Sequence, residues 1–245
     1  MRKHIIYQTY IDDVVVSKNQ NYQLPENYRW IKKRWWERLL CKISYGVGNI
    51  FSKWYCKCVL HVHVIDDSRW QPMAKQGFFV YGNHTQPVGD AFIPIYVLNG
   101  KRMRAIVSPA NLGIPVLGKV LPYLGALPIP QLDKMKDFFA AIKHYTQDKN
   151  GIMIYPEAHV WPYYTQIRPF GSAAFTYPVK QHLPTYCMTT TYQKRKKGDF
   201  PRITVYLDGP FEADSKKKLQ EQIMACMKER SKNSTYKYWT YEEEK

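Results

Sequence analysis

The chain has 245 residues and is 45% hydrophobic, so it can bury one large core. Its 36 Lys and Arg residues against 20 Asp and Glu give a formal net charge of +16, which favours anionic partners: nucleic acid, anionic membranes, acidic proteins or phosphate-bearing co-substrates. The five scattered cysteines make no disulfide framework, and no run approaches the ~18 apolar residues that cross a bilayer. We expect a protein without a signal peptide that is soluble or lies on a surface.

Residues 1–27 are rich in Tyr and alternate in character, which predicts a strand or an extended arm of unassigned role. Residues 28–60 carry eight basic side chains and one acidic one, in a pattern that predicts two amphipathic helices. One side of the first helix gathers Trp35, Trp36, Leu39, Leu40 and Ile43, and one face of the second gathers Val47, Ile50, Phe51, Trp54, Tyr55 and Cys58. Aromatic rings beside cations suit the headgroup boundary of an anionic membrane. Two ordinary helices packed on a core, with a solvated basic face, are the alternative.

After residue 60, short apolar and β-branched runs alternate with helical segments. The predicted strands cover 61–65, 77–81, 103–107, 151–155, 186–192 and 202–207. The predicted helices cover 133–147 and 214–230, the second after an Asp or Ser cap. This alternation predicts an α/β fold with a mixed, mostly parallel central sheet of about seven strands covered by helices. Residues 61–245 would form the main domain, preceded by an arm and membrane-facing amphipathic helices in residues 1–60.

The run CKCVLHVH offers two Cys and two His within eight residues, which are ligand types that zinc prefers. If this segment is extended, Cys56 and Cys58 point to one side and His61 and His63 to the other, so the four cannot converge on one ion. We therefore expect no metal site. The Gly spacings of a serine-hydrolase elbow and of a phosphate-binding loop are also missing.

A histidine and an aspartate follow the predicted strand 77–81, in the stretch NHTQPVGD. His84 would be held rigidly at the end of the strand, and the Pro and Gly after it let the chain fold back, so that Asp90 reaches the imidazole from the start of the next helix. The carboxylate would fix the ring tautomer and stabilise the imidazolium, which makes the pair a general base. No Ser or Cys precedes the pair in a suitable context, so the substrate would supply the attacking hydroxyl. A structural loop histidine is the alternative.

Two further stretches combine with this one. Residues 151–170 read GIMIYPEAHVWPYYTQIRPF, a buried strand ending in Tyr-Pro-Glu and then an aromatic loop, and residues 111–130 are apolar and punctuated by Gly and Pro. In this order, over roughly residues 60–210, the stretches resemble the glycerolipid acyltransferase family, the lysophosphatidic acid and glycerol-3-phosphate acyltransferases. NHTQPVGD resembles the family's motif of Asn-His, four residues and Asp, and YPEA resembles the start of its Phe-Pro-Glu-Gly-Thr-Arg motif.

The chain departs from the family pattern in three places. Five residues, not four, separate His84 from Asp90, so the loop must bulge for the pair to meet. The apolar stretch that ends near residue 130 resembles the family's second motif, which ends in Arg, but Gln131 stands at that position. In the third motif, Phe-Pro-Glu-Gly-Thr-Arg, a segment that begins with Ala158 replaces Gly-Thr-Arg. Those family arginines are associated with the acceptor's phosphate. Arg168 is the candidate substitute, since relatives of the tafazzin type carry an Arg before the Phe that ends this loop.

The resemblance implies transfer of a fatty acyl group from acyl-CoA or acyl carrier protein to the hydroxyl of a lysophospholipid, a 1-acylglycerol-3-phosphate-like acceptor, without a metal or another cofactor. It makes His84 and Asp90 catalytic, and Asn83, Glu157, Ala158 and Arg168 substrate-binding. Backbone N–H groups around Glu157 and Ala158 are the expected oxyanion donors, and the Glu157 side chain either scaffolds its loop or binds the acceptor. We expect a peripheral protein on the cytoplasmic, inner face of an anionic membrane that acts in phospholipid biosynthesis or remodelling and binds no nucleic acid.

Two other classes of protein stay open at this point. A catalytically inactive, membrane-peripheral lipid-binding protein on the same scaffold would leave His84 and Asp90 too far apart to hydrogen-bond. A basic nucleic-acid binder would stack bases on Tyr and Trp and hold phosphates with its cations. That second class leaves the Pro and Gly punctuation of the three motifs unexplained.

Overall fold

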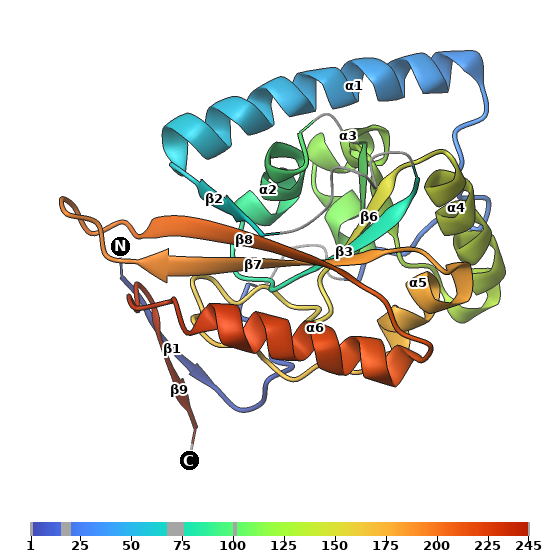
Figure 1. The fold of residues 1–245 in the computed structure, drawn as a ribbon. Helices are drawn as coiled ribbons and strands as arrows, with labels where there is room; N and C mark the ends of the chain where they lie inside the picture. Colours follow the sequence, from blue (N-terminus) through green and yellow to red (C-terminus); the bar gives the residue numbers. More distant parts are fainter. Residues whose placement is uncertain (1, 16–20, 68–75, 100–101, 245) are drawn as a thin grey trace.

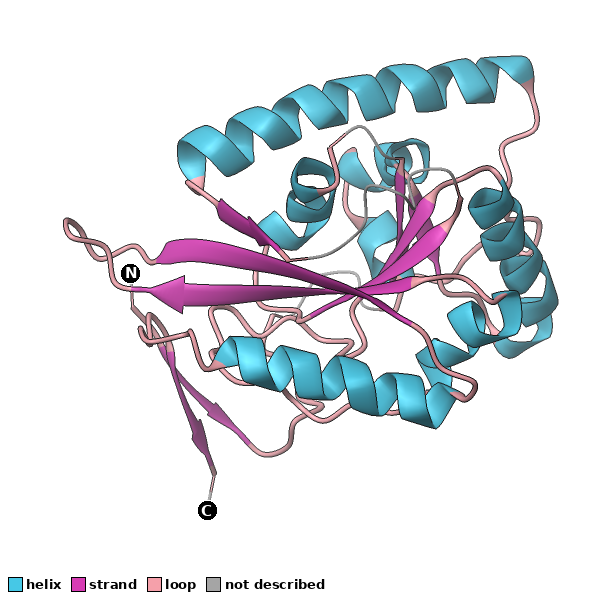
Figure 2. Cartoon of the chain, in the orientation of Figure 1, coloured by secondary structure: helices cyan, strands magenta, loops and turns pink. Residues whose placement is uncertain are grey.

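The computed structural model describes residues 2–15, 21–67, 76–99 and 102–244, and its centre is a seven-stranded sheet (Figures 1 and 2). In spatial order the strands are β2 (His63–Asp66), β8 (Arg202–Phe211), β7 (Thr185–Gln193), β3 (Phe78–Gly82), β6 (Gly151–Ile154), β4 (Met103–Val107) and β5 (Ala126–Pro128). β7 and β8 pair in antiparallel fashion, and every other neighbouring pair is parallel. The predicted α/β class, with a mixed and mostly parallel sheet, is confirmed.

Helices cover this sheet on both faces. They are α1 (Trp35–Trp54), α2 (Gly89–Val97), α3 (Leu117–Leu124), α4 (Met135–Gln147), α5 (Thr176–Gln181) and α6 (Lys216–Ser231), with short 3-10 or π segments at Tyr55–Val59, Pro109–Gly113, Leu132–Lys134 and Ala173–Phe175. Ser215 caps α6, since its Oγ accepts the Lys218 N–H at 3.3 Å. The helices predicted at 133–147 and 214–230 are thus α4 and α6.

β3 lies in the middle of the sheet and is buried along its whole length. Its side chains alternate between two cores, as a pleated strand requires. Phe79 and Tyr81 join the core beneath α4, α5 and α6, whereas Phe78 and Val80 join the core beneath α2. Because a strand covered on both faces is apolar throughout, it appears in the sequence as one continuous apolar run. The turn that follows β3 is therefore anchored by both cores.

The N-terminal arm pairs with the C-terminal part of the chain. β1 (His4–Tyr7) and β9 (Thr240–Glu243) form a separate, parallel two-stranded sheet (Figure 1). The rings of Tyr7 and Trp161 lie 4.7 Å apart, and Trp161 Nε1 donates to the Asp12 carbonyl at 2.9 Å. The arm thus packs on the loop that follows β6. Residues 16–20, which contributed to the strand prediction, lie outside the described residues.

Two expectations for the segment that precedes β2 are wrong. One helix, α1, replaces the predicted pair, and residues 28–34 are not helical. The extended geometry assumed for CKCVLHVH also fails, because Tyr55–Val59 continues α1 as a π segment in which Cys56 is buried and Cys58 is exposed. α1 stays continuous because it packs across α2 and α3, and such packing outweighs local propensity.

Within the described residues, no helix combines the length and the apolar character needed to cross a bilayer. The division of the chain at residue 60 stays a prediction. Trp30, on the N-terminal side of that division, lies in the core beneath α4, and its Nε1 donates to the Pro128 carbonyl at 2.9 Å.

Candidate functional site

His84 and Asp90 meet beyond the carboxyl end of β3. The strand ends at Gly82, His84 follows it, and Asp90 lies in the first turn of α2. His84 Nδ1 lies 2.7 Å from Asp90 Oδ2, the distance of a charge-assisted hydrogen bond. The carboxyl group is buried, while 19% of the histidine side chain is exposed. The structure thus brings the predicted pair together. The alternative of an inactive lipid-binding protein required the two side chains to be too far apart to hydrogen-bond.

A tight turn accommodates the additional residue between His84 and Asp90. Asp90 Oδ2 also accepts the Gln86 N–H at 3.0 Å, and the Gln86 carbonyl accepts the Asp90 N–H at 3.3 Å. Gln86 Nε2 donates to the Tyr192 hydroxyl at 3.0 Å, which ties the turn to β7. The five-residue spacing is thus compatible with a closed dyad, because the turn is fixed at Gln86 from both sides.

Asn83 joins the end of β3 to β7. Its Nδ2 donates to the Thr190 carbonyl at 2.9 Å, and its Oδ1 accepts the Thr190 N–H at 2.8 Å. The side chain is buried. Through these two hydrogen bonds, Asn83 fixes the backbone from which His84 projects. The predicted contact between Asn83 and substrate stays a prediction.

Glu157 connects the two loops of the site. Its side chain is fully buried, and its carboxylate accepts the backbone N–H of His84 at 2.9 Å and that of Arg168 at 2.8 Å. Arg168 Nη2 adds an ion pair at 3.2 Å. Of the two roles expected for Glu157, this geometry fits the scaffold and leaves no carboxylate surface for an acceptor.

Arg168 is buried together with Glu157. Its Nη1 donates to the Tyr10 carbonyl at 3.2 Å, its Nη2 also donates to the His159 carbonyl, and its guanidinium lies 4.8 Å from the centre of the Trp161 ring. Burial lowers the pKa of Arg168, and the Glu157 carboxylate opposes that shift. The guanidinium is fully buried and paired with Glu157, and its predicted contact with the acceptor stays a prediction. Through its hydrogen bond to Tyr10, Arg168 holds the loop that follows β6 against the N-terminal arm.

Ala158 is exposed beside this buried pair. It adopts a φ of +64°, the left-handed conformation that glycine favours, at the position where the resembled motif has Gly. Its N–H donates to the Tyr155 carbonyl at 3.1 Å. That donor closes a turn in this structure, and the oxyanion role expected for it stays a prediction.

Tyr155 is a site residue that the sequence interpretation missed. Its ring stacks on the His84 imidazole with centroids 4.4 Å apart and an interplanar angle of 15°. Its hydroxyl donates to the Asp90 carbonyl at 2.6 Å. Tyr155 thus contacts both members of the dyad. The sequence did contain a signal for this role, because YPEA has Tyr where the family motif has Phe. A buried tyrosine hydroxyl needs a hydrogen-bond partner, and that need indicates a contact within the site.

Burial of the Asp90 carboxyl group sets the electrostatics of the dyad. Burial raises the pKa of Asp90 above its ordinary value, and the hydrogen bonds from His84 and from the Gln86 N–H oppose this shift. The carboxylate beside the ring is placed to stabilise the positive charge that the imidazole gains when it takes a proton from a substrate. With Nδ1 engaged by Asp90, Nε2 is the ring nitrogen that can exchange a proton with a substrate.

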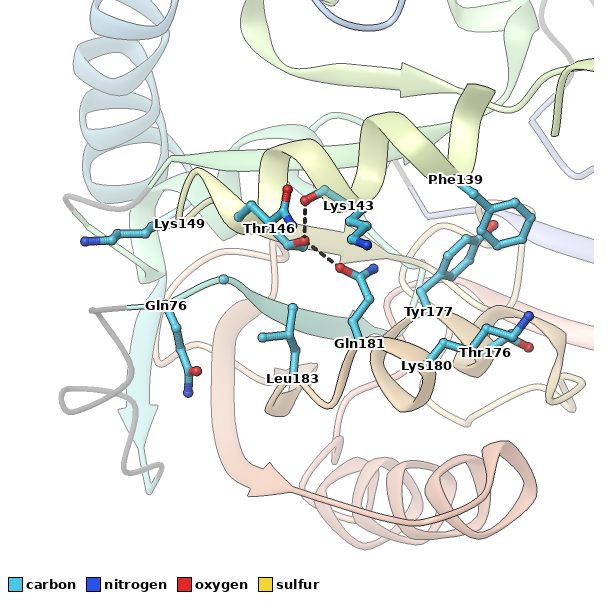
Figure 3. A pocket seen from close by; sticks show the side chains of 12 residues that line it. Gln76, Phe139, Lys143, Thr146, Lys149, Thr176, Tyr177, Lys180, Gln181 and Leu183 are labelled. Atoms are coloured by element: carbon cyan, nitrogen blue, oxygen red, sulfur yellow. Dashed lines mark hydrogen bonds between the residues drawn. The ribbon is translucent and has the colours of Figure 1, made fainter. Parts of the chain in front are cut away.

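The two cavities described in the structure lie away from the dyad. One, of about 570 Å³, lies between α4 and α5 near the start of β3 (Figure 3). The other, of about 430 Å³, lies between α5 and the start of α6. Neither His84 nor Asp90 lines either cavity. The exposed part of His84 faces the protein surface instead.

Comparisons by sequence find no relative, since no family model and no curated protein matches the chain. The fold is similar to that in the crystal structure of the 1-acyl-sn-glycerophosphate (LPA) acyltransferase, PlsC, from Thermotoga maritima. The TM-score is 0.55 at 13% identity, over 81% of this chain and 82% of that chain. At this identity the similarity shows the fold alone, so the function must be argued from the site.

Proposed function

We propose that the protein is an acyltransferase that moves a fatty acyl group from acyl-CoA or acyl carrier protein to the hydroxyl of a lysophospholipid, a 1-acylglycerol-3-phosphate-like acceptor. The observation that carries the proposal is the 2.7 Å hydrogen bond between His84 and Asp90 beyond the end of a central strand. The similarity of the fold to that of a 1-acyl-sn-glycerophosphate acyltransferase supports it.

In the proposed reaction, His84 Nε2 takes the proton of the acceptor hydroxyl as its oxygen attacks the thioester carbonyl. A C–O bond forms, the C–S bond breaks after a tetrahedral oxyanion, and the proton passes from His84 to the departing thiolate. Asp90 orients the imidazole and stabilises its charged form. A positioned base of this kind contributes about 10²- to 10⁴-fold to the rate. The transfer is direct, so the proposal includes no acyl-enzyme, metal or further cofactor.

The outward face of α1 supports a membrane as the source of the acceptor. Its large apolar side chains are exposed, among them Trp35 at 77% and Ile50 at 72%. The residues that α1 buries are small or polar instead: Glu37, Cys41, Gly48 and Ser52. A surface helix of a soluble protein shows the opposite pattern, with its apolar side chains buried and its polar ones exposed. We therefore propose that this face lies among the headgroups of a bilayer.

Basic side chains surround this apolar face. The exposed cations of α1 and its flanks include Arg34, Arg38, Lys42, Lys53 and Lys57. Each Lys or Arg near an anionic leaflet contributes about 1 kcal/mol to binding, and the chain as a whole carries +16. We propose binding to the anionic, cytoplasmic leaflet, and the same charge would attract an anionic thioester donor.

α2 connects the proposed membrane surface to the dyad. Asp90 lies in its first turn, and Phe92 contacts α1. The rings of Phe51 and Phe92 lie 4.9 Å apart, and Ser52 Oγ donates to the Phe92 carbonyl at 2.8 Å. An acceptor whose headgroup stays at the bilayer surface would therefore reach the dyad along one short helix.

The phosphate of the acceptor has no assigned partner. Gln131 occupies one position where the resembled family has Arg, and Arg168 is buried. The proposal therefore stays with lysophospholipids as a class, whose phosphate can remain at headgroup level while the hydroxyl reaches His84.

The test is to incubate the purified protein with labelled acyl-CoA or acyl carrier protein and with vesicles that carry a panel of lysophospholipids. We expect a labelled diacyl phospholipid from at least one donor and acceptor pair. Vesicle binding without acyl transfer for any pair would contradict the proposed activity and favour a lipid-binding protein on the same scaffold.

A further inference from the structure

A groove of about 570 Å³ opens between α4 and α5, next to the amino end of β3 (Figure 3). Gly77, which precedes β3, and Leu183, which precedes β7, both line it. A Cβ atom at Gly77 would lie 2.3 Å from the Thr146 carbonyl oxygen, so the chain passes directly against the last turn of α4. The volume falls within the range of about 300–1,000 Å³ that is typical of small-molecule sites.

Three lysines, here called the groove lysines, line this space: Lys143 and Lys149 from α4 and the turn after it, and Lys180 from α5. Within the part of the chain that the structure describes, no Asp or Glu lines the groove, and none of the groove lysines forms an ion pair. Lys149 has a φ of +59°, which is uncommon for a residue with a side chain. A concave surface lined by charge of one sign concentrates counter-ions. The groove is therefore suited to an anion.

The groove also contains aromatic surface and an amide donor. Phe139 is 39% exposed, and its ring centroid lies 5.1 Å from that of Tyr177. Figure 3 shows these two rings together at one end of the groove, with Lys143 and Gln181 further along it. Gln181 Oε1 accepts a hydrogen bond from the Thr146 hydroxyl at 2.6 Å. The N–H groups of the same side-chain amide can therefore donate to a ligand in the groove.

We propose that this groove binds a nucleotide, with the planar base on Phe139 and the phosphates on the groove lysines. Bases of every kind stack on aromatic side chains, and lysine ammonium groups bind phosphate as point charges. An inorganic anion would not use the ring, and a neutral aromatic molecule would not use the cations. The combination therefore favours a phosphorylated compound with a planar ring.

This site is separate from the proposed acyl transfer. The groove lies at the amino end of β3, whereas His84 follows its carboxyl end. β3 has five residues, which span about 17 Å. A nucleotide in the groove would not contact His84, so this proposal does not depend on the proposed activity. Adenine nucleotides occur both free and as part of coenzyme A, and either could supply the ligand.

Calorimetric titration of the full chain with ATP, coenzyme A, adenosine and inorganic phosphate tests the proposal. ATP or coenzyme A is expected to bind more tightly than adenosine or phosphate, and less tightly as salt increases. The double variant Lys143→Gln/Lys180→Gln and, separately, Phe139→Ala are expected to weaken binding at least ~10-fold. Lys136→Gln, which is exposed on α4 outside the groove, is the matched control and should keep wild-type affinity.

The proposal is overturned if neither ATP nor coenzyme A binds in the micromolar to low millimolar range. It is also overturned if folded groove variants bind as well as the wild type, or if Lys136→Gln weakens binding as much as they do. Phosphate that binds as tightly as ATP, with no effect of Phe139→Ala, would exclude the base contact. Should Phe139→Ala unfold, Phe139→Leu keeps the packing, and the same loss of affinity is expected.

Discussion

Three contacts of different kinds restrain His84. Asp90 binds its Nδ1 at 2.7 Å, Tyr155 stacks on its ring at 4.4 Å, and Glu157 accepts its backbone N–H at 2.9 Å. The contacts come from α2 and from the loop after β6, so two elements fix one imidazole. A general base depends on such orientation, because a displacement of about 1 Å can cost ~10²-fold in rate.

Tyr155→Phe keeps the stacked ring and removes the hydrogen bond to the Asp90 carbonyl. We expect the free energy of unfolding to fall by about 1 kcal/mol, and kcat of acyl transfer to fall roughly 10-fold with KM unchanged, because orientation and not substrate binding is affected. Urea unfolding and steady-state kinetics measure the two effects. Tyr96→Phe on α2 is the control, since no hydrogen bond of its hydroxyl is found within the described residues. Unchanged kcat in Tyr155→Phe would contradict the positioning role.

Ala158→Gly removes a methyl group from a residue at φ +64°. The left-handed conformation costs a non-glycine residue roughly 1–2 kcal/mol, and Ala158 is exposed, so little packing is lost. We expect the free energy of unfolding to rise by about 1 kcal/mol. Ala91→Gly, at an exposed position inside α2, is the matched control and should destabilise by about 0.5–1 kcal/mol. Destabilisation by both substitutions would show that Ala158 is not strained.

The dyad could be predicted from sequence because its parts are local. Strand end, turn and helix start lie within a few residues, and only six positions separate His84 from Asp90. The roles of Glu157 and Arg168 could not be predicted in the same way. Glu157 binds a backbone N–H 73 positions away, and Arg168 binds the Tyr10 carbonyl 158 positions away. Sequence pattern indicates a buried charge poorly when its partners are so distant.

At the level of elements, long apolar runs were predicted well and short or interrupted ones were not. The strand predicted at 151–155 is β6 (Gly151–Ile154) to within one residue, because a strand buried along its whole length leaves a continuous apolar run. β5 has three residues and ends in Pro128, and α5 has six residues and contains Pro178, so neither leaves a clear period. The continuity of α1 was missed because it depends on tertiary contacts, such as the 2.9 Å hydrogen bond from the Met103 N–H to the Tyr45 hydroxyl.

Ile50→Glu and Trp54→Glu place carboxylates on the outward face of α1. These residues are 72% and 54% exposed, so we expect changes of less than about 0.5 kcal/mol in the free energy of unfolding. Co-sedimentation with anionic vesicles should weaken at least ~10-fold, because a carboxylate is repelled by the leaflet and resists burial. Ile6→Glu, at a residue of β1 that is 63% exposed, is the control and should bind as the wild type does. Equal binding by all three variants would contradict the assignment of this face.

At the level of the whole molecule, both ends of the described chain support the site. The rings of Trp161 and Tyr241 stack with centroids 5.2 Å apart, and Arg168 reaches the Tyr10 carbonyl from the same loop. His4 contacts Thr240, 236 positions away. The sequence left the arm without a role because pairing over such a separation has no local signature.

Buried phenols and thiols make the stability of the whole molecule dependent on alkaline pH. Burial raises the pKa of Cys56 and of Tyr163 to about 12, and raises those of Tyr81, Tyr155 and Tyr192 well above their ordinary value. The folded state therefore keeps protons that the unfolded chain releases. The contribution of these buried Cys and Tyr side chains to stability is fully present below their pKa values in the unfolded chain, about 8.5 for Cys and 10 for Tyr. It is lost as the pH rises above those values.

We expect the free energy of unfolding to fall between pH 8 and pH 10, by about 0.4 kcal/mol for each such tyrosine and about 1–2 kcal/mol for Cys56 at pH 10. Urea unfolding at pH 8, 9 and 10 measures the fall. Cys56→Ala should show a shallower dependence on pH than the wild type, because its share is removed. A stability that stays level or rises over this range would be inconsistent with these shifts.

The central claim is that His84 acts as the base in acyl transfer, and the rate of transfer by His84→Gln tests it most directly. Wild type and variant are compared on the same vesicles, with the same donor and at equal amounts of vesicle-bound protein. The account predicts that kcat falls at least ~10²-fold in the variant while vesicle binding is retained. A variant that transfers the acyl group at the wild-type rate would contradict it.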